Sequence, residues 1–403
     1  MHELKERTSM QMVFIYEDKI AMDVDGNYYT GSAFSQAVFD RYLQHFDHIT
    51  LVMRKAQIAP EDTEALSHMN RISSDRISVS FIPDTRENIR SFLTPSVHRE
   101  LKRIVISEID KAQAVIIRAH SVSGYIAAKY CRKNGIPYLA EAVGCPWDSL
   151  WNHSLRGKIL APFVRRQMRF IMRHAAYAVY VTDTFLQKRY PTNGKAAAIS
   201  DVELQTTDDQ VLDRRMEHIR SHSGKLKIGT AGALHVSYKG QRFVIKALSK
   251  LKAQGLTDFE YHLAGGGDNT ALLDLAQKLG VEDQVIFDGA LPHEAVFEWL
   301  DDLDIYIQPS LVEAMPRALI EAMSRGLPSF GSKIGGIPEL LTPSFVFSRG
   351  DVDSIVRKLK SLTLKVLVRA AKRNFKYTQR FEKGSLEKKR FEFYSSFASE
   401  VRK

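Results

Sequence analysis

Two glutamates, Glu313 and Glu321, are the side chains whose types and spacing are most informative about chemistry. They lie in the segment Ile305–Leu341, which reads IYIQPSLVEAMPRALIEAMSRGLPSFGSKIGGIPELL. The apolar run Ile305–Gln308 predicts a strand, and Pro316 predicts the start of a helix because proline suits the first helical turn. Eight residues along a helix span about 12 Å. The two carboxylates are therefore too far apart to act as a close acid–base pair.

The helix N-terminus between these glutamates favours an anionic ligand. Its free backbone N–H groups, from about Ala314 to Ala318, attract phosphate. A ligand with a central diphosphate and a polyol at each end fits this pattern, and a nucleotide-sugar has that shape. The spacing is also compatible with a simpler interpretation, in which Glu313 caps the helix and Glu321 is a solvated helix residue.

The whole segment resembles the signature of retaining glycosyltransferase family 4, of the type that builds bacterial surface polysaccharides, and this family has the GT-B fold. The signature reads P-S-x-x-E-x-x-P-x-x-x-x-E-A-M-x-x-G-x-P, followed by G-G-x-x-E. The matching residues are Pro309, Ser310, Glu313, Pro316, Glu321, Ala322, Met323, Gly326, Pro328, Gly335, Gly336 and Glu339. Three earlier motifs follow in the family's order, namely Gly232 with Lys239-Gly240, then Gly265-Gly266-Gly267, then Val285–Leu291. The resemblance is strong over about residues 226–345 and weak in the first half.

The resemblance implies how the second half would hold a nucleotide-sugar. Glu321 would bind the ribose hydroxyls of the donor, Glu313 would lie near the transferred sugar, and Lys239 would neutralise the departing diphosphate. The backbone would hold the sugar hydroxyls and the diphosphate along Met315, Pro316, Arg317 and Ala318. It would also approach the nucleotide at Gly265, Gly266 and Gly267, and read the base edge near Gly289 and Ala290. A fixed lysine and a helix N-terminus stabilise negative charge where it forms, so we expect no metal and no cofactor beyond a UDP- or GDP-linked sugar.

Two positions depart from the family's pattern, and one acidic run needs a separate interpretation. Ala233 stands where the family often carries an arginine that pairs with the diphosphate, so one cation is missing. Ala314 stands where the family often has glycine, which narrows the backbone angles available. The acidic run Asp301-Asp302-Leu303-Asp304 directly precedes a strand, which is not where an Asp-x-Asp metal motif is expected. We therefore predict that this run faces solvent.

The first half contributes three weaker candidates. His120 follows the predicted strand Ala114–Arg118, at the edge where open α/β sheets bind ligands. The resemblance implies that it contacts the donor sugar, and the alternative is a structural histidine. Gly31 follows the first strand after a long loop, where the family has a glycine-rich loop that meets the diphosphate and the acceptor. The cluster Gly144–Asp148 either lines the acceptor side or is a packed loop with a buried tryptophan.

Short apolar runs that alternate with helical patterns must position these residues. Such alternation predicts βαβ units and mostly parallel sheets, and thirteen strands are too many for one sheet of this kind. The predicted strands are Met12–Tyr16, Ile49–Met53, Ile77–Ile82, Ala114–Arg118, Pro137–Val143, Ala178–Thr182, Ala196–Ser200, Leu226–Thr230, Glu260–Ala264, Gln284–Asp288, Ile305–Gln308, Pro328–Phe330 and Phe345–Phe347. We therefore predict an α/β protein with two Rossmann-like doubly wound domains that face a cleft, as in the GT-B fold.

A polar stretch with little apolar periodicity, Asp201–Lys225, predicts the linker between the domains. An acceptor-side domain would then cover residues 1–204, and a nucleotide-sugar-binding domain would cover residues 205–384. The aromatic-rich end of the chain, residues 385–403, looks helical. In the GT-B fold the last helix crosses back, so we expect it to dock on the first domain.

Composition limits the class of protein. The chain has 403 residues, of which 44 % are hydrophobic and 26 % charged, and these values exclude a disordered or collagen-like chain. Two cysteines, Cys131 and Cys145, are too few for a disulfide framework and favour a reducing compartment. Met1–Lys19 carries charges throughout, unlike a secretory signal, and no apolar stretch approaches the roughly 20 residues needed to cross a bilayer. We expect a cytoplasmic protein, at the inner face of the cell membrane.

The net charge of +10 is local, and it indicates an anionic partner. Two windows without acidic residues, Ser149–Thr182 and Ser354–Phe381, hold more positive charges than the whole net excess. The first contains a basic amphipathic helix, Leu160–His174, so residues 158–174 either contact anionic lipid or form a solvated helix face. Its basic residues are Arg165, Arg166, Arg169 and Arg173, and its apolar residues are Phe163, Met168, Ile171 and Met172. The second window predicts a solvated helix pair, and the lack of stacking aromatics among the basic residues argues against nucleic-acid binding.

The sequence thus predicts a retaining glycosyltransferase of the hexosyltransferase type. It would move a sugar from a nucleoside-diphosphate-sugar to a hydroxyl acceptor, and we expect a lipid-linked glycan in polysaccharide assembly. Two alternatives remain. One is another GT-B enzyme, such as a nucleotide-sugar epimerase or a phosphorylase. The other is a basic protein that binds lipid or nucleic acid without catalysis.

Overall fold

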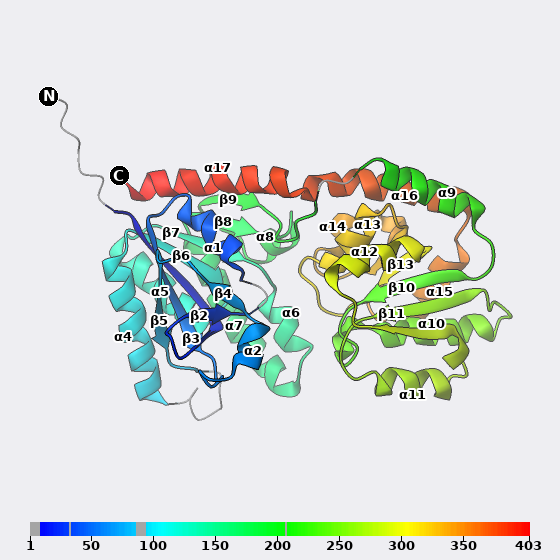
Figure 1. Cartoon of the computed structure of the whole chain (residues 1–403), viewed down its shortest axis with the longest axis horizontal. Coiled ribbons are helices and arrows are strands. Elements are labelled where there is room, and N and C mark those ends of the chain that lie inside the picture. Colours follow the sequence, from blue (N-terminus) through cyan, green and yellow to red (C-terminus); the bar gives the residue numbers. More distant parts are fainter. Residues whose placement is uncertain (1–8, 32–33, 86–93, 206–207) are drawn as a thin grey trace.

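The computed structural model describes residues 9–31, 34–85, 94–205 and 208–403. It contains two separate β-sheets, one of nine strands and one of six, and helices pack around each of them (Figure 1). The nine-stranded sheet is built from the first half of the chain and the six-stranded sheet from the second half. The predicted fold class, two doubly wound α/β units, is therefore confirmed.

The first sheet is parallel in its main body. Its strands are β1 (Gln11–Met22), β2 (Tyr28–Thr30), β3 (His48–Lys55), β4 (Asn70–Ile72), β5 (Ile77–Ile82), β6 (Ala114–Ala119), β7 (Tyr138–Ala142), β8 (Tyr177–Tyr180) and β9 (Lys195–Ala198). The parallel strands follow the order β5-β3-β1-β6-β7-β8-β9. The strand order changes direction between β1 and β6, and open α/β sheets bind ligands beyond the carboxyl ends of the strands at such a switch point.

Two short strands correct the sequence analysis. We expected a loop over Glu17–Tyr29, but β1 continues to Met22 and pairs antiparallel with β2, which pairs in turn with β4. The register of β1 against β3 shifts between Ile15 and Lys19. This irregularity lets the strand continue through charged residues that interrupt its apolar run.

The second sheet repeats the doubly wound order with six parallel strands. They are β10 (Leu226–Ala231), β11 (Phe259–Ala264), β12 (Val285–Gly289), β13 (Ile305–Gln308), β14 (Ser329–Ser332) and β15 (Val346–Phe347). Their order is β12-β11-β10-β13-β14-β15, so the switch point lies between β10 and β13. Any ligand site of this half is expected in the loops that follow these two strands.

Helices cover both faces of the first sheet because successive residues of a strand point to opposite faces. Met12 and Phe14 of β1 join an apolar cluster with residues of α1 and α17, whereas Val13 and Ile15 join a second cluster with residues of α4, α5 and α7. The helices that follow the strands of this half are α1 (Gln36–Leu43), α2 (Thr63–Ser67), α4 (Pro95–Lys111), α5 (Val122–Asn134), α6 (Pro146–Trp151), α7 (Leu155–His174) and α8 (Phe185–Arg189). The remaining helices are α9 (Gln210–Ser221), α10 (Gln241–Lys252), α11 (Thr270–Lys278), α12 (His293–Asp302), α13 (Arg317–Ser324), α14 (Ile337–Leu340), α15 (Val352–Lys360), α16 (Leu364–Thr378) and α17 (Lys383–Val401).

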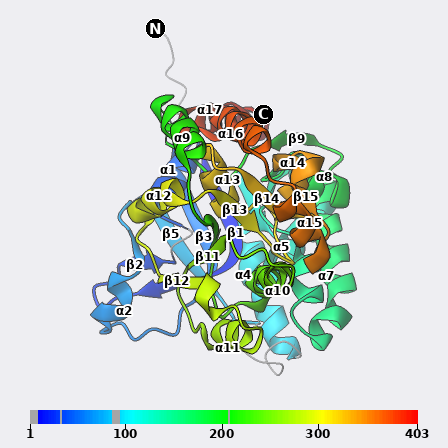
Figure 2. The ribbon, with the colours of Figure 1, turned by 90° about the vertical axis from the view of Figure 1, so that its right-hand side faces the viewer.

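The last helix, α17, lies against the first sheet, and α16 and α17 follow one side of the molecule in both views (Figures 1 and 2). Tyr394 of α17 donates to the carboxylate of Glu141 at 2.6 Å, and Tyr42 of α1 donates to the same oxygen at 2.7 Å. Glu141 is only 3 % exposed and also pairs with Arg118 at 2.9 Å. Burial and the charge of Glu141 raise the pKa of the Tyr394 phenol well above its ordinary value, so it stays a hydrogen-bond donor.

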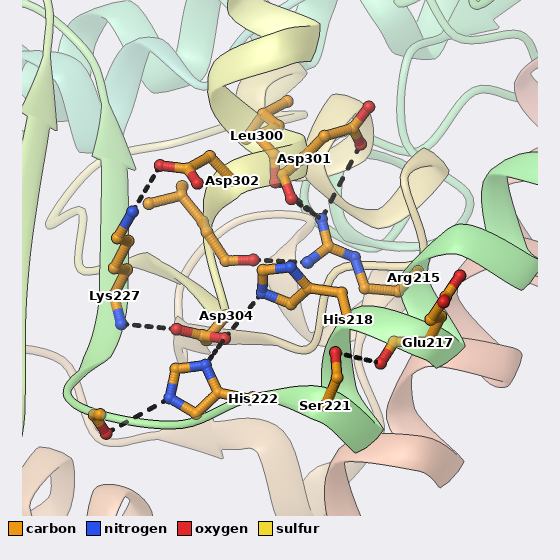
Figure 3. A network of polar contacts seen from close by, with 12 residues as sticks. Arg215, Glu217, His218, Ser221, His222, Lys227, Leu300, Asp301, Asp302 and Asp304 are labelled. Atoms are coloured by element: carbon orange, nitrogen blue, oxygen red, sulfur yellow. Dashed lines mark hydrogen bonds and ion pairs between the residues drawn. The ribbon is translucent and has the colours of Figure 1, made fainter.

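The segment between the two sheets contains helix α9, which corrects the expectation of an aperiodic polar linker. Val211, Met216 and Ile219 of α9 are buried, and so is Arg215. The Arg215 guanidinium donates to the carbonyls of Leu300 at 2.8 Å and of Asp301 (Figure 3). Burial lowers the pKa of Arg215 to about 10, which still leaves it charged at neutral pH. The helix was missed because an arginine forms part of its buried face.

Candidate active site

Lys239 and Glu313 meet at the switch point of the second sheet. Lys239 follows β10 and Glu313 follows β13, and the Lys239 Nζ lies 2.8 Å from the Glu313 Oε1. Ser310 donates its hydroxyl to the same carboxylate oxygen at 3.0 Å. Gly240 has a φ of +82°, and a Cβ there would collide with the Pro309 carbonyl, so glycine lets the two loops touch. The structure thus brings together two residues to which the sequence analysis gave separate roles.

Glu321 lies on α13, one turn into the helix, and is 6 % exposed. This burial rules out the solvated interpretation. Only the last residues of the stretch Glu313–Glu321 are helical, because α13 begins at Arg317 with Pro316 as its N-cap. Burial raises the pKa of the Tyr306 phenol, and the charges of Glu321 and Glu313 raise it further, so both carboxylates lie within electrostatic reach of that ring.

The N-terminus of α13 lies between these two glutamates, as the sequence predicted. Met315 and Ala318 are partly exposed, Pro316 is buried, and the exposed Arg317 side chain donates to the Asp201 carbonyl at 3.4 Å. A helix start next to Glu313 and Lys239 offers backbone N–H donors and partial positive charge. Such an end suits an anionic ligand.

The predicted glycine turn lies beside the loop that follows β10. The Gly265 N–H donates to the Gly289 carbonyl at 2.8 Å, and the Leu234 N–H donates to the Gly266 carbonyl at 3.0 Å. A Cβ on Gly265 would collide with the Gly232 carbonyl, and one on Gly267 would collide with the ring of His235. A Cβ on Gly266 would contact the Ala290 methyl group at 3.7 Å. The loops after β10, β11 and β12 therefore form one packed backbone surface.

His120 lines a cavity of about 1030 Å³ on the first-domain side. Its Nε2 lies 3.0 Å from the Gln167 Oε1. The cavity lies at the switch point of the first sheet, since Tyr16 of β1 and Ala119 of β6 also line it. Its walls are Tyr16, Thr85, Ala119, His120, Val122, Val143, Gly144, Cys145, Pro146, Ser149, Leu150, Leu160, Phe163, Val164 and Gln167.

The cavity has polar features that the sequence analysis did not single out. The Thr85 hydroxyl is 1 % exposed and has no hydrogen-bond partner among the described residues. The Arg165 Nε, on helix α7, is also buried without a hydrogen-bond partner in the described part of the chain, but Arg165 stacks on Trp147 and is not among the residues that line the cavity. Buried polar groups normally have partners, so the Thr85 hydroxyl is a candidate hydrogen-bonding group for a ligand in the cavity. No local sequence signal marks Thr85, because only the fold brings it to this edge.

Gly31 and the cluster Gly144–Asp148 have different outcomes. Gly144, Cys145 and Pro146 line the cavity, as one of the two interpretations expected. Gly31 accepts hydrogen bonds from Phe34 and from the Asn70 side chain, each at 3.0 Å, and none of these three residues lines the cavity. Ser32, the next residue of the predicted loop, lies outside the described residues.

The two halves meet at the loop that carries Glu313. Ala314 and Met315 pack against the apolar cluster of the first sheet that includes Ala119 and Cys145, two residues of the cavity wall. The cavity and the Lys239–Glu313 pair are therefore parts of one contact region between the halves.

Helix α7 exposes an apolar and basic surface, but not the one predicted. Met168, Ile171 and Met172 are fully buried under the helix, and Arg165 stacks on the Trp147 ring at 5.2 Å. We define the α7 surface by the residues that are exposed instead. They are Leu155 (78 %), Ile159 (69 %), Leu160 (42 %) and Phe163 (66 %), together with Arg156, Lys158, Arg166, Arg169 and Arg173. Tertiary packing, rather than helical periodicity alone, decides which face is free.

One group of residues could hold a metal ion. Ligand atoms of His218, His222 and Asp304 lie within 4.8 Å of one another (Figure 3). Both imidazoles lie 2.9 Å from the Asp304 Oδ1, and the Lys227 N–H donates to Oδ2 at 2.8 Å. These hydrogen bonds explain why the three side chains lie close together. They also connect α9 and the residue that follows it to the second sheet. Asp304 is buried, so the prediction that the acidic run faces solvent is wrong for this residue.

Comparisons with known proteins agree with this geometry. Residues 215–377 match the family Glycosyl transferases group 1. Protein CapJ of Staphylococcus aureus is 31 % identical over 351 residues, which cover 86 % of this chain and 85 % of that protein. The amylovoran biosynthesis glycosyltransferase AmsK of Erwinia amylovora is 38 % identical over 135 residues, covering 31 % of this chain and 33 % of that protein.

Solved structures share the fold across the whole chain. Sucrose-phosphate synthase from Thermosynechococcus elongatus superposes with a TM-score of 0.66 at 16 % identity, over 97 % of this chain and 100 % of that one. Anabaena HepE in complex with UDP gives a TM-score of 0.61 at 15 % identity, over 96 % and 100 % of the chains. The chain belongs to the group 1 glycosyltransferases and has their two-domain GT-B fold.

Proposed function

We propose that this enzyme transfers a sugar with retention of its anomeric configuration, from a nucleoside-diphosphate-sugar bound at the second switch point to an acceptor hydroxyl in the first-domain cavity. The observation that supports this most directly is the Lys239–Glu313 pair beside the start of α13. In this proposal, Glu321 binds the ribose hydroxyls of the donor, and the backbone of the Gly265–Gly267 turn contacts its nucleotide. His120 contacts the transferred sugar from the cavity side.

The charges that develop during transfer match these residues. The bond between the sugar C1 and the diphosphate oxygen breaks, and negative charge collects on the diphosphate. The Lys239 ammonium and the α13 N-terminus stabilise that charge in place. The acceptor oxygen bonds to C1 on the face that the diphosphate leaves, and the hydroxyl proton passes to the departing phosphate oxygen. This chemistry uses no metal ion and no nucleophile from the chain.

The first experiment measures release of free nucleoside diphosphate from a panel of UDP-, GDP- and ADP-sugars, with and without a chelator. We expect release from a UDP- or GDP-sugar at a rate that the chelator does not change. NMR of the product then reports the anomeric configuration, which we expect to match the donor's. No release from any donor contradicts catalysis, and chelator-sensitive release contradicts metal independence.

We further propose that the acceptor is a lipid-linked glycan at the inner face of the cell membrane. Leu160 and Phe163 belong both to the cavity wall and to the exposed α7 surface, so the cavity opens next to exposed apolar side chains. Basic residues flank them on the same helix, and each contributes about 1 kcal/mol of attraction to anionic lipid. No helix in the described part of the chain is long and apolar enough to cross a bilayer. Among the relatives, AmsK is by its name a glycosyltransferase of amylovoran biosynthesis.

Liposome flotation tests this proposal. Replacing Arg166, Arg169 and Arg173 with Gln is expected to lower binding to vesicles that contain anionic lipid, and so is Ile159→Ser with Phe163→Ser. Donor affinity should not change. The matched control replaces Lys365, Arg369 and Lys372, which are exposed on α16, with Gln. Equal binding by the α7 variants and the wild type refutes the docking surface.

A further inference from the structure

A carboxylate of the second domain holds the start of a helix in the first domain. Glu339 of α14 accepts the Asp183 N–H at 2.7 Å through Oε2, and the Thr184 and Phe185 N–H groups at 3.1 and 2.5 Å through Oε1. The Thr184 hydroxyl also donates to Oε1, at 2.9 Å. One side chain thus satisfies four donors of the neighbouring domain.

This contact adds to the local capping of α8. Thr184 is the N-cap of α8, but its side chain makes no capping hydrogen bond. The first N–H groups of any helix need partners. The Leu186 N–H donates to the Thr182 hydroxyl at 3.0 Å, whereas Glu339, from the other half of the chain, accepts the Phe185 N–H and the two N–H groups that precede it. Arg380 reinforces the contact through an ion pair with Asp183 at 2.9 Å, and Tyr377 donates to the Glu339 carbonyl at 2.8 Å.

On one side, the segment just before Glu339 contacts the loop that carries Glu313, which we call the donor loop. The Gly336 N–H donates to the Ala314 carbonyl at 2.7 Å. A Cβ on Gly335 would collide with the Glu313 carbonyl, so the turn and the loop are in close backbone contact. A Cβ on Gly336 would also reach Thr182 of the first domain at 3.3 Å. The short segment before Glu339 therefore touches both the donor loop and the other half.

On the other side, the contact continues to the cavity wall. Arg189, the last residue of α8, pairs with Asp148 at 2.6 Å and also donates to the Cys145 Sγ. Asp148 is 5 % exposed, and Cys145 lines the cavity. Helix α8 thus lies between Glu339 and the wall of the proposed acceptor site.

We propose that Glu339 is a positioning residue that holds the two domains at the separation at which the donor loop faces the acceptor cavity. It touches neither substrate, and its role in turnover rests on the function proposed above. Loss of the carboxylate leaves the Asp183, Thr184 and Phe185 N–H groups without this acceptor and lets α8 and the cavity wall move away from the Glu313 loop.

The test compares Glu339→Gln and Glu339→Ala with the wild type by steady-state kinetics and by small-angle X-ray scattering. For Glu339→Ala we expect about a tenfold lower kcat and a raised KM for the acceptor, in the range usual for coupled sites. Affinity for the nucleoside diphosphate should change less than about twofold, because that site lies within the second domain. Glu339→Gln keeps one acceptor oxygen, so its kcat and its acceptor KM should lie between those of Glu339→Ala and the wild type. The radius of gyration of Glu339→Ala should exceed that of the wild type.

Two controls separate positioning from general destabilisation. Glu298→Ala removes an exposed glutamate of α12 and should leave the kinetics and the radius of gyration unchanged. Arg380→Gln weakens the same contact and should shift both readouts in the same direction as Glu339→Ala, by less. The proposal fails if Glu339→Ala keeps the wild-type kcat, acceptor KM and radius of gyration, or if nucleotide affinity falls as much as turnover. If the wild type releases no nucleotide from any donor, the proposed function fails, and the scattering comparison still decides the role of Glu339.

Discussion

The two sheets have the same doubly wound order and yet present different surfaces at their switch points. In the second sheet, the loops after β10 and β13 are in backbone contact and hold the charged pair of Lys239 and Glu313. In the first sheet, the strands β1 and β6 end at a cavity of about 1030 Å³ with mostly apolar walls. The shared strand order therefore places a ligand site at the same position in each sheet. The residues around each site then determine which part of the reaction it can carry out.

The contrast extends to the residues that form each surface. Around the second site, glycines at 232, 240, 265 and 267 have positive φ and pack where a Cβ would touch neighbouring atoms. Such a surface suits the invariant part of a donor, its diphosphate. Around the first site, every lining residue except Gly144 carries a side chain, so substitution can reshape the cavity. We expect changes at the second site to affect catalysis strongly and changes at the first to affect acceptor binding.

The largest effect should come from Lys239→Ala. This substitution removes the cation closest to the proposed leaving diphosphate, and loss of one such group typically lowers kcat by about 10²–10³-fold. The measurement is nucleoside diphosphate release at saturating donor. Lys250→Ala, on the exposed side of α10, is the matched control. A Lys239→Ala enzyme within about threefold of the wild type would remove the lysine from the mechanism.

Substitution of the two glutamates of the second site should affect different quantities, nucleotide affinity for one and turnover for the other. Glu321→Ala should weaken nucleoside diphosphate binding by about 10- to 100-fold, the usual cost of losing hydrogen bonds to a charged group. Glu313→Ala should mainly lower turnover. Isothermal titration calorimetry and kinetics distinguish the two outcomes. Equal nucleotide affinity of Glu321→Ala and the wild type contradicts the ribose assignment.

A smaller effect is expected at the first site from Thr85→Val. Valine has the same shape as threonine and removes a buried hydroxyl without a partner among the described residues. The Tm should therefore stay or rise, whereas loss of one hydrogen bond should raise the acceptor KM by about three- to tenfold. Nucleotide affinity should stay unchanged. A lowered Tm with an unchanged acceptor KM would show that the hydroxyl serves the fold.

The smallest effect concerns stability and pH at Asp304, in the second half. Burial raises the pKa of this carboxyl, but hydrogen bonds from His218 and from the Lys227 N–H lower it more, so it lies below its ordinary value of 3.8. A lowered folded-state pKa stabilises the protein above the unfolded pKa, and this contribution is lost as pH falls through the folded value. In urea unfolding, the free-energy difference between the wild type and Asp304→Asn should therefore shrink from about pH 5 to about pH 3. A difference that does not depend on pH contradicts the assignment.

Sequence reasoning located the elements whose patterns are local. Ile77–Ile82 and Ile305–Gln308 were predicted with the bounds that the structure has. The strands β2 and β4 escaped notice because each has three residues and pairs with a distant segment, as Tyr28 does with Ile72. The exposed face of α7 was mistaken because the core of the first domain, and not the helix itself, decides that Met168 is buried.

The same division applies to the site. Lys239 and Glu313 belong to two different motifs and lie 74 positions apart, and the sequence analysis gave each residue a role without predicting that they meet. The structure brings them within 2.8 Å. Glu339 carries no local signal for the role proposed here because its partners lie in another element, and Thr85 carries none because only the fold brings it to the cavity. Glu339 is part of the motif, yet its carboxylate reaches Asp183, which is 156 positions away in the chain.

The return of α17 to the first sheet has a consequence for biosynthesis. Phe14 of β1 and Phe397 of α17 belong to the same apolar cluster, and both are fully shielded from solvent. During translation, residues near the amino end emerge first, but the apolar surface around Phe14 stays uncovered until α17 has left the ribosome. A nascent chain stalled before Lys383 should therefore depend on chaperones, and the half that is made first is the half that is completed last.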